Sequence, residues 1–144
     1  MTNLRILNIN LAKSLNLKTI PDLTDSIQLE ELTLENCQLK HLTSSFCVNK
    51  KALKKLDLTR NELNSLAFIF DRCDHLNLLD LSYNRLVSIR HMFNRDSQLL
   101  YLVVDQNQIE SVGVNDLKYL DKLLELSIAF NKLEFIHVNV SYFT

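Results

Sequence analysis

The chain has few side chains that could perform catalysis or bind a metal. Its thiols and imidazoles are Cys37, Cys47, Cys73, His41, His75, His91 and His137. The triplet Cys73-Asp74-His75 places a thiol close to an imidazole, but no second pair of ligands follows at zinc-site spacing. A zinc site built from Cys47, Cys73 and His75 would need two separate loops to converge. We therefore predict no metal site.

The sequence also lacks the motifs that mark common enzyme classes. It contains neither H-E-x-x-H nor G-x-S-x-G. Glycine occurs once, as Gly113, so glycine-rich loops that hold phosphate groups are excluded by count. No residue is a candidate catalytic residue. We predict a protein that is not an enzyme and that carries no cofactor.

The feature that organises the chain is a spacing of leucines. The pattern L-x-x-L-x-L-x-x-N-x-L begins at Leu53, Leu76, Leu99 and Leu123, with Val104, Ile109 and Ile128 in place of some leucines. An earlier copy begins at Leu29 and has Cys37 at the asparagine position. A still earlier one keeps only Leu4, Leu7 and Ile9. Successive copies start 23 to 25 residues apart.

Each copy predicts one short strand. In x-x-L-x-L-x-x the side chains alternate between two faces, so the leucines point into a core and the residues between them point outward. Copies stacked about 4.8 Å apart form a parallel sheet, and the residues after each asparagine supply the crossover that parallel strands require. The crossovers are bulkier than the strands, so the stack bends with the sheet on its concave side.

The asparagine of each copy has a physical role of its own. After the strand the backbone turns, which leaves amide groups pointing inward without a sheet partner. A side-chain amide both donates and accepts, so stacked asparagines can satisfy these groups in a ladder. The predicted ladder consists of Cys37, Asn61, Asn84, Asn107 and Asn131. A thiol donates only weakly, and we expect Cys37 to be buried and structural.

This pattern resembles the leucine-rich repeat family over nearly the whole chain. The resemblance implies the α/β class and a right-handed leucine-rich repeat solenoid, with a curved parallel sheet and a convex side of loops and 3-10 turns. The repeat length, with Leu42, Leu66, Ile89, Val112 and Ile136 at position 14, is similar to the typical, extracellular class of repeat. We expect one domain over residues 1–144, with six repeats starting near 4, 29, 53, 76, 99 and 123, the first degenerate.

The crossovers contribute a second apolar series on the convex side. Phe46, Phe70 and Phe93 fall at position 18 of their repeats, and Leu117 lies one residue later in a longer crossover. For Cys47 and Cys73, at positions 19 and 21 of adjacent repeats, we expect two buried thiols. The alternative is a disulfide, because their Cα atoms could approach within the required ~4.4–6.8 Å in an oxidising compartment.

A ligand would meet the outward-facing strand residues. Leu78, Tyr101 and Val103 are apolar where a solvent-facing strand should be polar, with Tyr83 and Phe130 at the edge. We predict that this patch contacts a protein partner, against the alternative that it is ordinary exposed apolar surface. Asp57, Asp80 and Asp105 step diagonally across adjacent strands beside Arg60. We expect this acidic stripe to be a solvated face.

Composition and the resemblance limit the kinds of partner and the cellular compartments to be expected. The chain has 16 basic and 17 acidic residues, a net charge of −1, which does not point to nucleic acid. No run of apolar residues is long enough to span a membrane. The resemblance implies an extracellular or innate-immune recognition module, similar to segments of Toll-like receptors or insect leucine-rich immune proteins. The alternative is a cytosolic scaffold or regulatory subunit.

The two ends of the chain lead to further expectations. Leu15, Leu17, Ile20, Leu23 and Ile27 could cover the core at the front, and nothing similar follows at the back. Because an open core end is an aggregation hazard, we expect the chain to be part of a longer protein. Asn139-Val140-Ser141 is an N-glycosylation triplet, which would matter only in a secreted protein.

Overall fold

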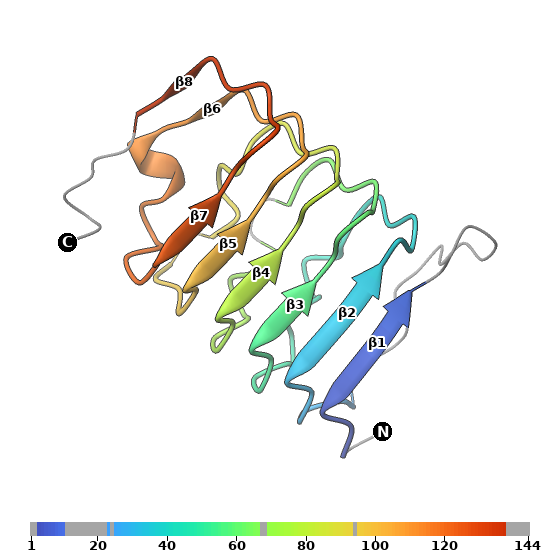
Figure 1. Ribbon diagram of the computed structural model, residues 1–144. Coiled ribbons are helices and arrows are strands. Elements are labelled where there is room, and N and C mark those ends of the chain that lie inside the picture. The colour runs from blue at the N-terminus through green and yellow to red at the C-terminus, as the bar shows by residue number, and fades with distance from the viewer. Residues whose placement is uncertain (1–2, 11–22, 24, 67–68, 94, 138–144) are drawn as a thin grey trace.

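The computed structural model describes residues 3–10, 23, 25–66, 69–93 and 95–137. Its main element is a six-stranded parallel sheet in the order β1-β2-β3-β4-β5-β7 (Figure 1). The strands are β1 (Ile6–Asn10), β2 (Glu31–Glu35), β3 (Lys55–Asp57), β4 (Leu78–Asp80), β5 (Tyr101–Val103) and β7 (Glu125–Ser127). Each repeat thus contributes one strand, and the chain has the solenoid fold that its leucine spacing predicts.

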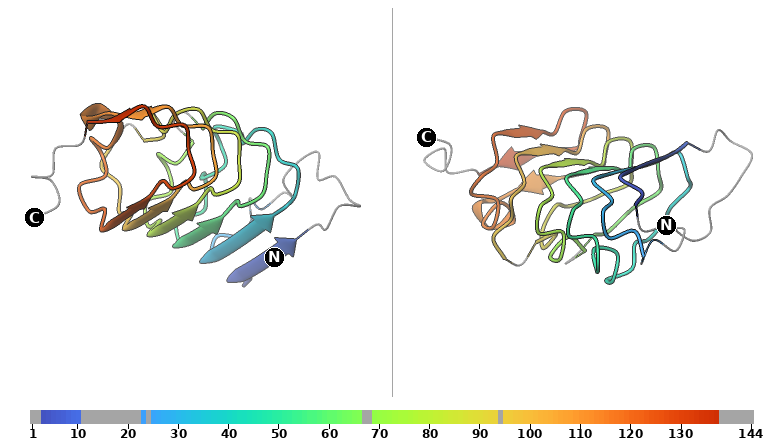
Figure 2. Two further views of the ribbon diagram at one scale, coloured as in Figure 1. Left: turned by 45° about the horizontal axis from the view of Figure 1, so that its top comes forward. Right: turned by 90° about the horizontal axis from the view of Figure 1, so that it is seen from below.

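The strand leucines form the core. Leu32, Leu56, Leu79 and Leu102 are register partners across β2, β3, β4 and β5, and all are fully buried. Each such side chain stabilises the fold by roughly 2 kcal/mol relative to an exposed one. Figure 2 shows the sheet on one side of the molecule and the connecting segments on the other. The core lies between these two layers.

The first repeat forms a more complete strand than its sequence indicates. We expect a degenerate copy there, yet β1 pairs with β2 over five residues, from Ile6↔Glu31 to Asn10↔Glu35. Leu4, Leu7 and Ile9 pack against the core while remaining half-exposed. Of the residues predicted to cover this end, Leu23 is buried and Ile27 is exposed. Leu15, Leu17 and Ile20 lie outside the described residues.

The convex side agrees with the predicted phenylalanine series. Phe46, Phe70 and Phe93 are buried, and the ring centroids of Phe70 and Phe93 are 5.8 Å apart. Leu117 packs against the core half-buried. The position-14 residues Leu42, Leu66, Ile89 and Val112 are also buried.

The last repeats depart from a purely irregular convex side. Val112 and Ile136 are register partners in a second small parallel sheet of β6 (Ser111–Val112) and β8 (Phe135–Ile136), which the leucine pattern does not predict. One 3-10 turn, η1 (Val114–Asp116), follows β6. Ile136 remains 50% exposed. It belongs to the last described turn, where no further described repeat packs against it.

The asparagine ladder runs through the described repeats. In the middle of it, the Asn84 side-chain oxygen accepts from the Leu63 amide at 3.0 Å. Its amide nitrogen donates to the Leu81 carbonyl at 2.9 Å and to the Leu58 carbonyl of the preceding repeat at 3.0 Å. Asn61, Asn107 and Asn131 repeat this arrangement. Each asparagine therefore joins two consecutive turns of the solenoid.

Cys37 takes the ladder position in the second repeat. Its Sγ lies 3.2 Å from the Glu35 carbonyl and 3.8 Å from the Ile9 carbonyl of the first repeat, and the side chain is fully buried. The thiol can donate weakly to these oxygens but cannot donate to both as an amide does. Cys37 therefore fills the ladder position with weaker hydrogen bonds than its neighbours.

Candidate functional site: the concave face of the sheet

The concave face presents its side chains in straight rows, because the register is constant from strand to strand. Leu78 and Tyr101 are register partners, and Glu125 continues their row on β7. Asp80 and Val103 are register partners in the next row. Leu78, Tyr101 and Val103 therefore lie on two adjacent strands as one apolar patch. Tyr101 is 38% exposed, and the other two are half-buried.

The aspartates of this face are arranged differently from the predicted diagonal stripe. Asp57 and Asp80 are register partners and lie directly side by side. The Asp57 carboxylate accepts from the Thr59 amide at 2.9 Å, and the Asp80 carboxylate accepts from the Ser82 amide and hydroxyl. These bonds close the turn at the end of each strand. The spacing Asp-Leu-Thr/Ser in both repeats is the signal that could have predicted this role.

Asp105 lies in another row and joins two repeats. Its carboxylate accepts from the Ser127 hydroxyl at 2.8 Å and from the Ala129 amide at 2.7 Å. All three aspartates are half-buried. They therefore have structural hydrogen bonds of their own while keeping their negative charge on the concave face.

A further row follows the strands at their carboxyl ends. Asn36, Arg60, Tyr83, Gln106 and Phe130 each precede a ladder residue. All have positive φ, between 54° and 57°. This left-handed conformation costs roughly 1–2 kcal/mol for a residue other than glycine. It recurs because the chain must turn sharply to place the next side chain in the ladder. Phe130 is 77% exposed and Tyr83 is 47% exposed.

Within this row, a cation is already held by an aromatic ring and a carboxylate. The Arg60 guanidinium carbon lies 4.5 Å from the centroid of the Tyr83 ring. Its Nε also lies 3.4 Å from a Glu35 carboxylate oxygen. The sequence predicts Arg60 beside the acidic stripe and Tyr83 at the edge of the apolar patch, and nothing in it indicates that the two side chains stack.

The convex side contains a disulfide, which is the alternative to the predicted pair of buried thiols. Cys47 and Cys73 are bonded, with their Cα atoms 5.0 Å apart, so the expectation of two buried thiols is wrong. Both cysteines are buried, as are Phe46 and Phe70 in the same two crossovers. Since bonded sulfurs are not thiolates, Cys47 and Cys73 do not act as zinc ligands with His75.

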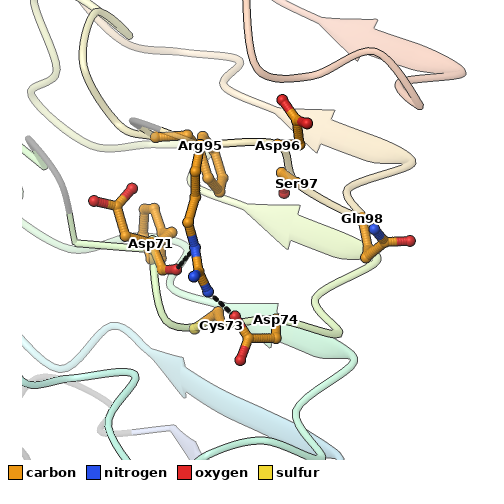
Figure 3. A pocket seen from close by; sticks show the side chains of 9 residues that line it. Asp71, Cys73, Asp74, Arg95, Asp96, Ser97 and Gln98 are labelled. Atoms are coloured by element: carbon orange, nitrogen blue, oxygen red, sulfur yellow. Dashed lines mark hydrogen bonds and ion pairs between the residues drawn. The ribbon is translucent and has the colours of Figure 1, made fainter.

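Two small hollows flank the disulfide. One, of about 200 Å³, is lined by Phe70, Phe93 and Arg95 among others, and the second, of about 130 Å³, contacts Cys47. Figure 3 shows Arg95 reaching across the larger hollow toward Asp71 and Asp74. Arg95 forms an ion pair with Asp74 and donates to the Asp71 carbonyl at 2.6 Å. Residues of the preceding crossover therefore already bind the Arg95 guanidinium.

The described residues form neither a metal-binding cluster nor a membrane-spanning helix. Among them, no group of three or more histidines, cysteines or carboxylates lies close enough to hold a metal ion. None of the helical segments in the described part of the chain is long and apolar enough to cross a membrane. The Asn139-Val140-Ser141 triplet lies outside the described residues.

The fold and the repeat ladder define a class of protein. The chain carries leucine-rich repeats arranged as a leucine-rich repeat solenoid, and residues 27–86 match the "Leucine rich repeat" family model. A similar protein is the leucine-rich repeat-containing G-protein coupled receptor 4 of Xenopus tropicalis. It is 36% identical over 61 residues, which are 42% of this chain and 6% of that receptor.

A solved structure supports the same fold. A chain of the TLR13–ssRNA13 complex superimposes with a TM-score of 0.57 at 20% identity, covering 94% of this chain and 21% of that one. The chain therefore spans well under two thirds of either relative. At this identity the structural likeness shows the fold and does not identify a ligand.

Proposed function

We propose that this solenoid recognises a protein partner with the concave face, through the patch of Leu78, Tyr101 and Val103. The observation that carries this proposal is the side-by-side placement of Leu78 and Tyr101 on a solvent-facing sheet. Apolar and aromatic residues ringed by polar ones are typical of the centre of a protein interface. The rim consists of Asp57, Arg60, Asp80, Tyr83, Asp105 and Phe130.

The role is one of binding and not of catalysis. The rim carboxylates already accept structural hydrogen bonds: Asp57 and Asp80 accept from their own turns, and Asp105 accepts from Ala129 of the next repeat. None of the described strand residues around Leu78 and Tyr101 is a histidine that could exchange a proton with a carboxylate. The negative charge of the face favours a protein over a nucleic acid, because phosphates would be repelled.

The compartment that fits this role is extracellular, with the chain acting as part of a longer receptor or secreted recognition protein of innate-immune type. The support is the Cys47–Cys73 disulfide, since such bonds persist in oxidising environments. The alternative, a cytosolic scaffold, would have to keep this bond against a reducing glutathione pool.

A displayed library of protein fragments tests the proposal. Fragments that bind the wild-type chain are tested again on a folded Leu78→Ser/Tyr101→Ser variant. The matched control is Val48→Ser/Val87→Ser, which removes two exposed apolar side chains away from the sheet. We expect selected fragments to bind the control at least tenfold more tightly than the patch variant, because interface anchors contribute about 1–2 kcal/mol each. Equal affinity for both variants would remove the proposal.

A further inference from the structure

The concave face has a charge that the chain as a whole does not have. Its strand and turn positions hold six carboxylates and two cations, a formal charge of −4, whereas the whole chain carries −1. The carboxylates are Glu31, Glu35, Asp57, Asp80, Asp105 and Glu125, and the cations are Lys55 and Arg60. The face that holds the apolar patch is therefore the acidic face of the molecule.

The structure also shows how this face accommodates a guanidinium. Arg60 is held with its guanidinium over the Tyr83 ring and beside the Glu35 carboxylate. An aromatic face attracts a cation through its quadrupole, and a flat guanidinium stacks on it better than an ammonium does. Glu35, Arg60 and Tyr83 thus form an internal example of a cation held between an acid and an aromatic ring.

An acid and an aromatic ring also lie side by side nearby, and there no described residue supplies the cation. Tyr101 on β5 and Glu125 on β7 are register partners, so they lie about one strand spacing, ~4.8 Å, apart along the row. Both are exposed, and among the described residues no cation lies over the Tyr101 ring. Asp105 adds a further negative charge four residues after Tyr101.

We infer that the partner presents an arginine-bearing basic segment to the concave face, with one guanidinium stacked on Tyr101 beside Glu125. This inference rests on the proposed function and adds the chemistry of the partner. The arginine pairs with Glu125, and the apolar neighbours Leu78 and Val103 contact the aliphatic part of the segment. Asp57 and Asp80 attract the remaining basic residues without giving up their turn hydrogen bonds.

A defined peptide tests the inference without knowledge of the natural partner. The probe is a fluorescent nonapeptide of alternating arginine and serine, compared with the same peptide containing lysine or glutamate in place of arginine. We expect the arginine peptide to bind, the lysine peptide to bind about threefold more weakly, and the glutamate peptide to show no binding. Salt should weaken the arginine complex, since the attraction is largely electrostatic.

Single variants then locate the binding site. Glu125→Gln and Tyr101→Ser should each weaken the arginine peptide by about threefold. The matched control is Glu31→Gln, which removes the same charge from the same row at the other end of the sheet and should change affinity by much less.

The outcomes separate this inference from the proposed function. Arginine-specific binding that depends on Tyr101 and Glu125 supports it. Equal binding of the three peptides, no binding of the arginine peptide, or equal effects of Glu125→Gln and Glu31→Gln would overturn it. Fragments selected from the displayed library would still report on the patch, so the proposed function stands or falls on that separate measurement.

Discussion

The concave and convex sides of this solenoid are built from the same repeats, yet they are held together differently. On the concave side every described repeat contributes one strand in constant register, and the asparagine ladder repeats with nearly the same bond lengths. On the convex side adjacent crossovers differ. One pair is joined by a disulfide, another by the contact of two tilted phenylalanine rings, and the last by a two-stranded sheet.

The difference shows which contacts the repeat itself determines. A leucine at every second position must form a strand with one buried face, so neighbouring copies align automatically. The crossovers only need to fill the space under the core, and several combinations of residues do this. Substitutions on the two sides should therefore lower the free energy of unfolding by different amounts and should disturb different parts of the molecule.

The largest loss of stability is expected in the ladder. Replacing Asn84 with Ala leaves the Leu63 amide without its partner and removes one of the two asparagine donors from the carbonyls of Leu58 and Leu81, which keep those from Asn61 and Asn107. A buried amide left without a hydrogen bond costs about 1–3 kcal/mol, and each of the two lost hydrogen bonds costs about 0.5–1.5 kcal/mol more. We expect the free energy of unfolding to fall by about 4 kcal/mol in urea denaturation. The exposed Asn64→Ala variant is the control, and a loss in Asn84→Ala of less than 1 kcal/mol would contradict the ladder account.

The convex disulfide should contribute somewhat less. It links residues 26 positions apart, and closing a loop of this length stabilises a fold by about 3 kcal/mol in the chain-entropy model. Cys47→Ser/Cys73→Ser should lower the free energy of unfolding by about this amount, and reducing agent should have the same effect on the wild type.

The same disulfide variant also shows how far a change on the convex side spreads through the molecule. Hydrogen exchange should accelerate most in the crossovers that contain residues 47 and 73, and in β3 and β4 only by the amount that the lower free energy of global unfolding requires. If neither reducing agent nor the double substitution changes the midpoint of urea unfolding, the disulfide does not stabilise the convex side.

A smaller effect is expected for the stacked phenylalanines. Phe70 is buried against Phe93, and Phe70→Leu removes part of this contact while keeping the site apolar. We expect a loss of about 1–2 kcal/mol, measured by urea denaturation. A loss as large as that of Asn84→Ala would mean that convex packing controls stability as much as the ladder does.

The smallest effect concerns pH and the edge of the sheet. Hydrogen bonds from Lys54 and Arg5 lower the pKa of Glu30 from its ordinary value, and the Glu30 side chain is 22% exposed. A carboxylate whose pKa is lowered by folding stabilises the fold above its unfolded pKa. That contribution disappears as the pH falls through the lower, folded pKa. Stability should therefore decrease slightly below about pH 4.5, the unfolded value.

The Lys54→Met variant tests this assignment. It removes the first of the two donors, so the pKa of Glu30 should rise toward its ordinary value in an NMR titration. Lys55→Met, which changes the next residue on the strand, is the matched control. A Glu30 pKa that is the same in both variants would show that Lys54 does not set it.

The sequence was sufficient for the elements whose residues repeat. The spacing of Leu56 and Leu58, or of Leu79 and Leu81, predicts strands because alternation permits only one buried face. Asn61 and its counterparts predict the ladder because a turn needs a side chain that donates and accepts. The sequence also brought Leu78 and Tyr101 together, since equal positions in adjacent repeats are neighbours.

What the sequence could not provide depends on the exact positions of side chains that do not repeat. Predicting the Cys47–Cys73 bond requires the relative position of the two crossovers in space. The repeat positions 19 and 21 do not determine that position. The stacking of Arg60 on Tyr83 needed the positive φ of both residues, which directs their side chains along the rim. The β6–β8 pair needed the backbone of the last repeats, where no leucine pattern applies.

The most direct test of the account is the footprint of a bound fragment on the chain. A fragment selected from the displayed library should slow hydrogen exchange in residues 78–83, 101–106 and 125–130 and leave the crossovers that carry Cys47 and Cys73 unchanged. This result would place recognition on the concave face, around Leu78 and Tyr101. Protection confined to the convex crossovers, with the strand segments unaffected, would contradict it.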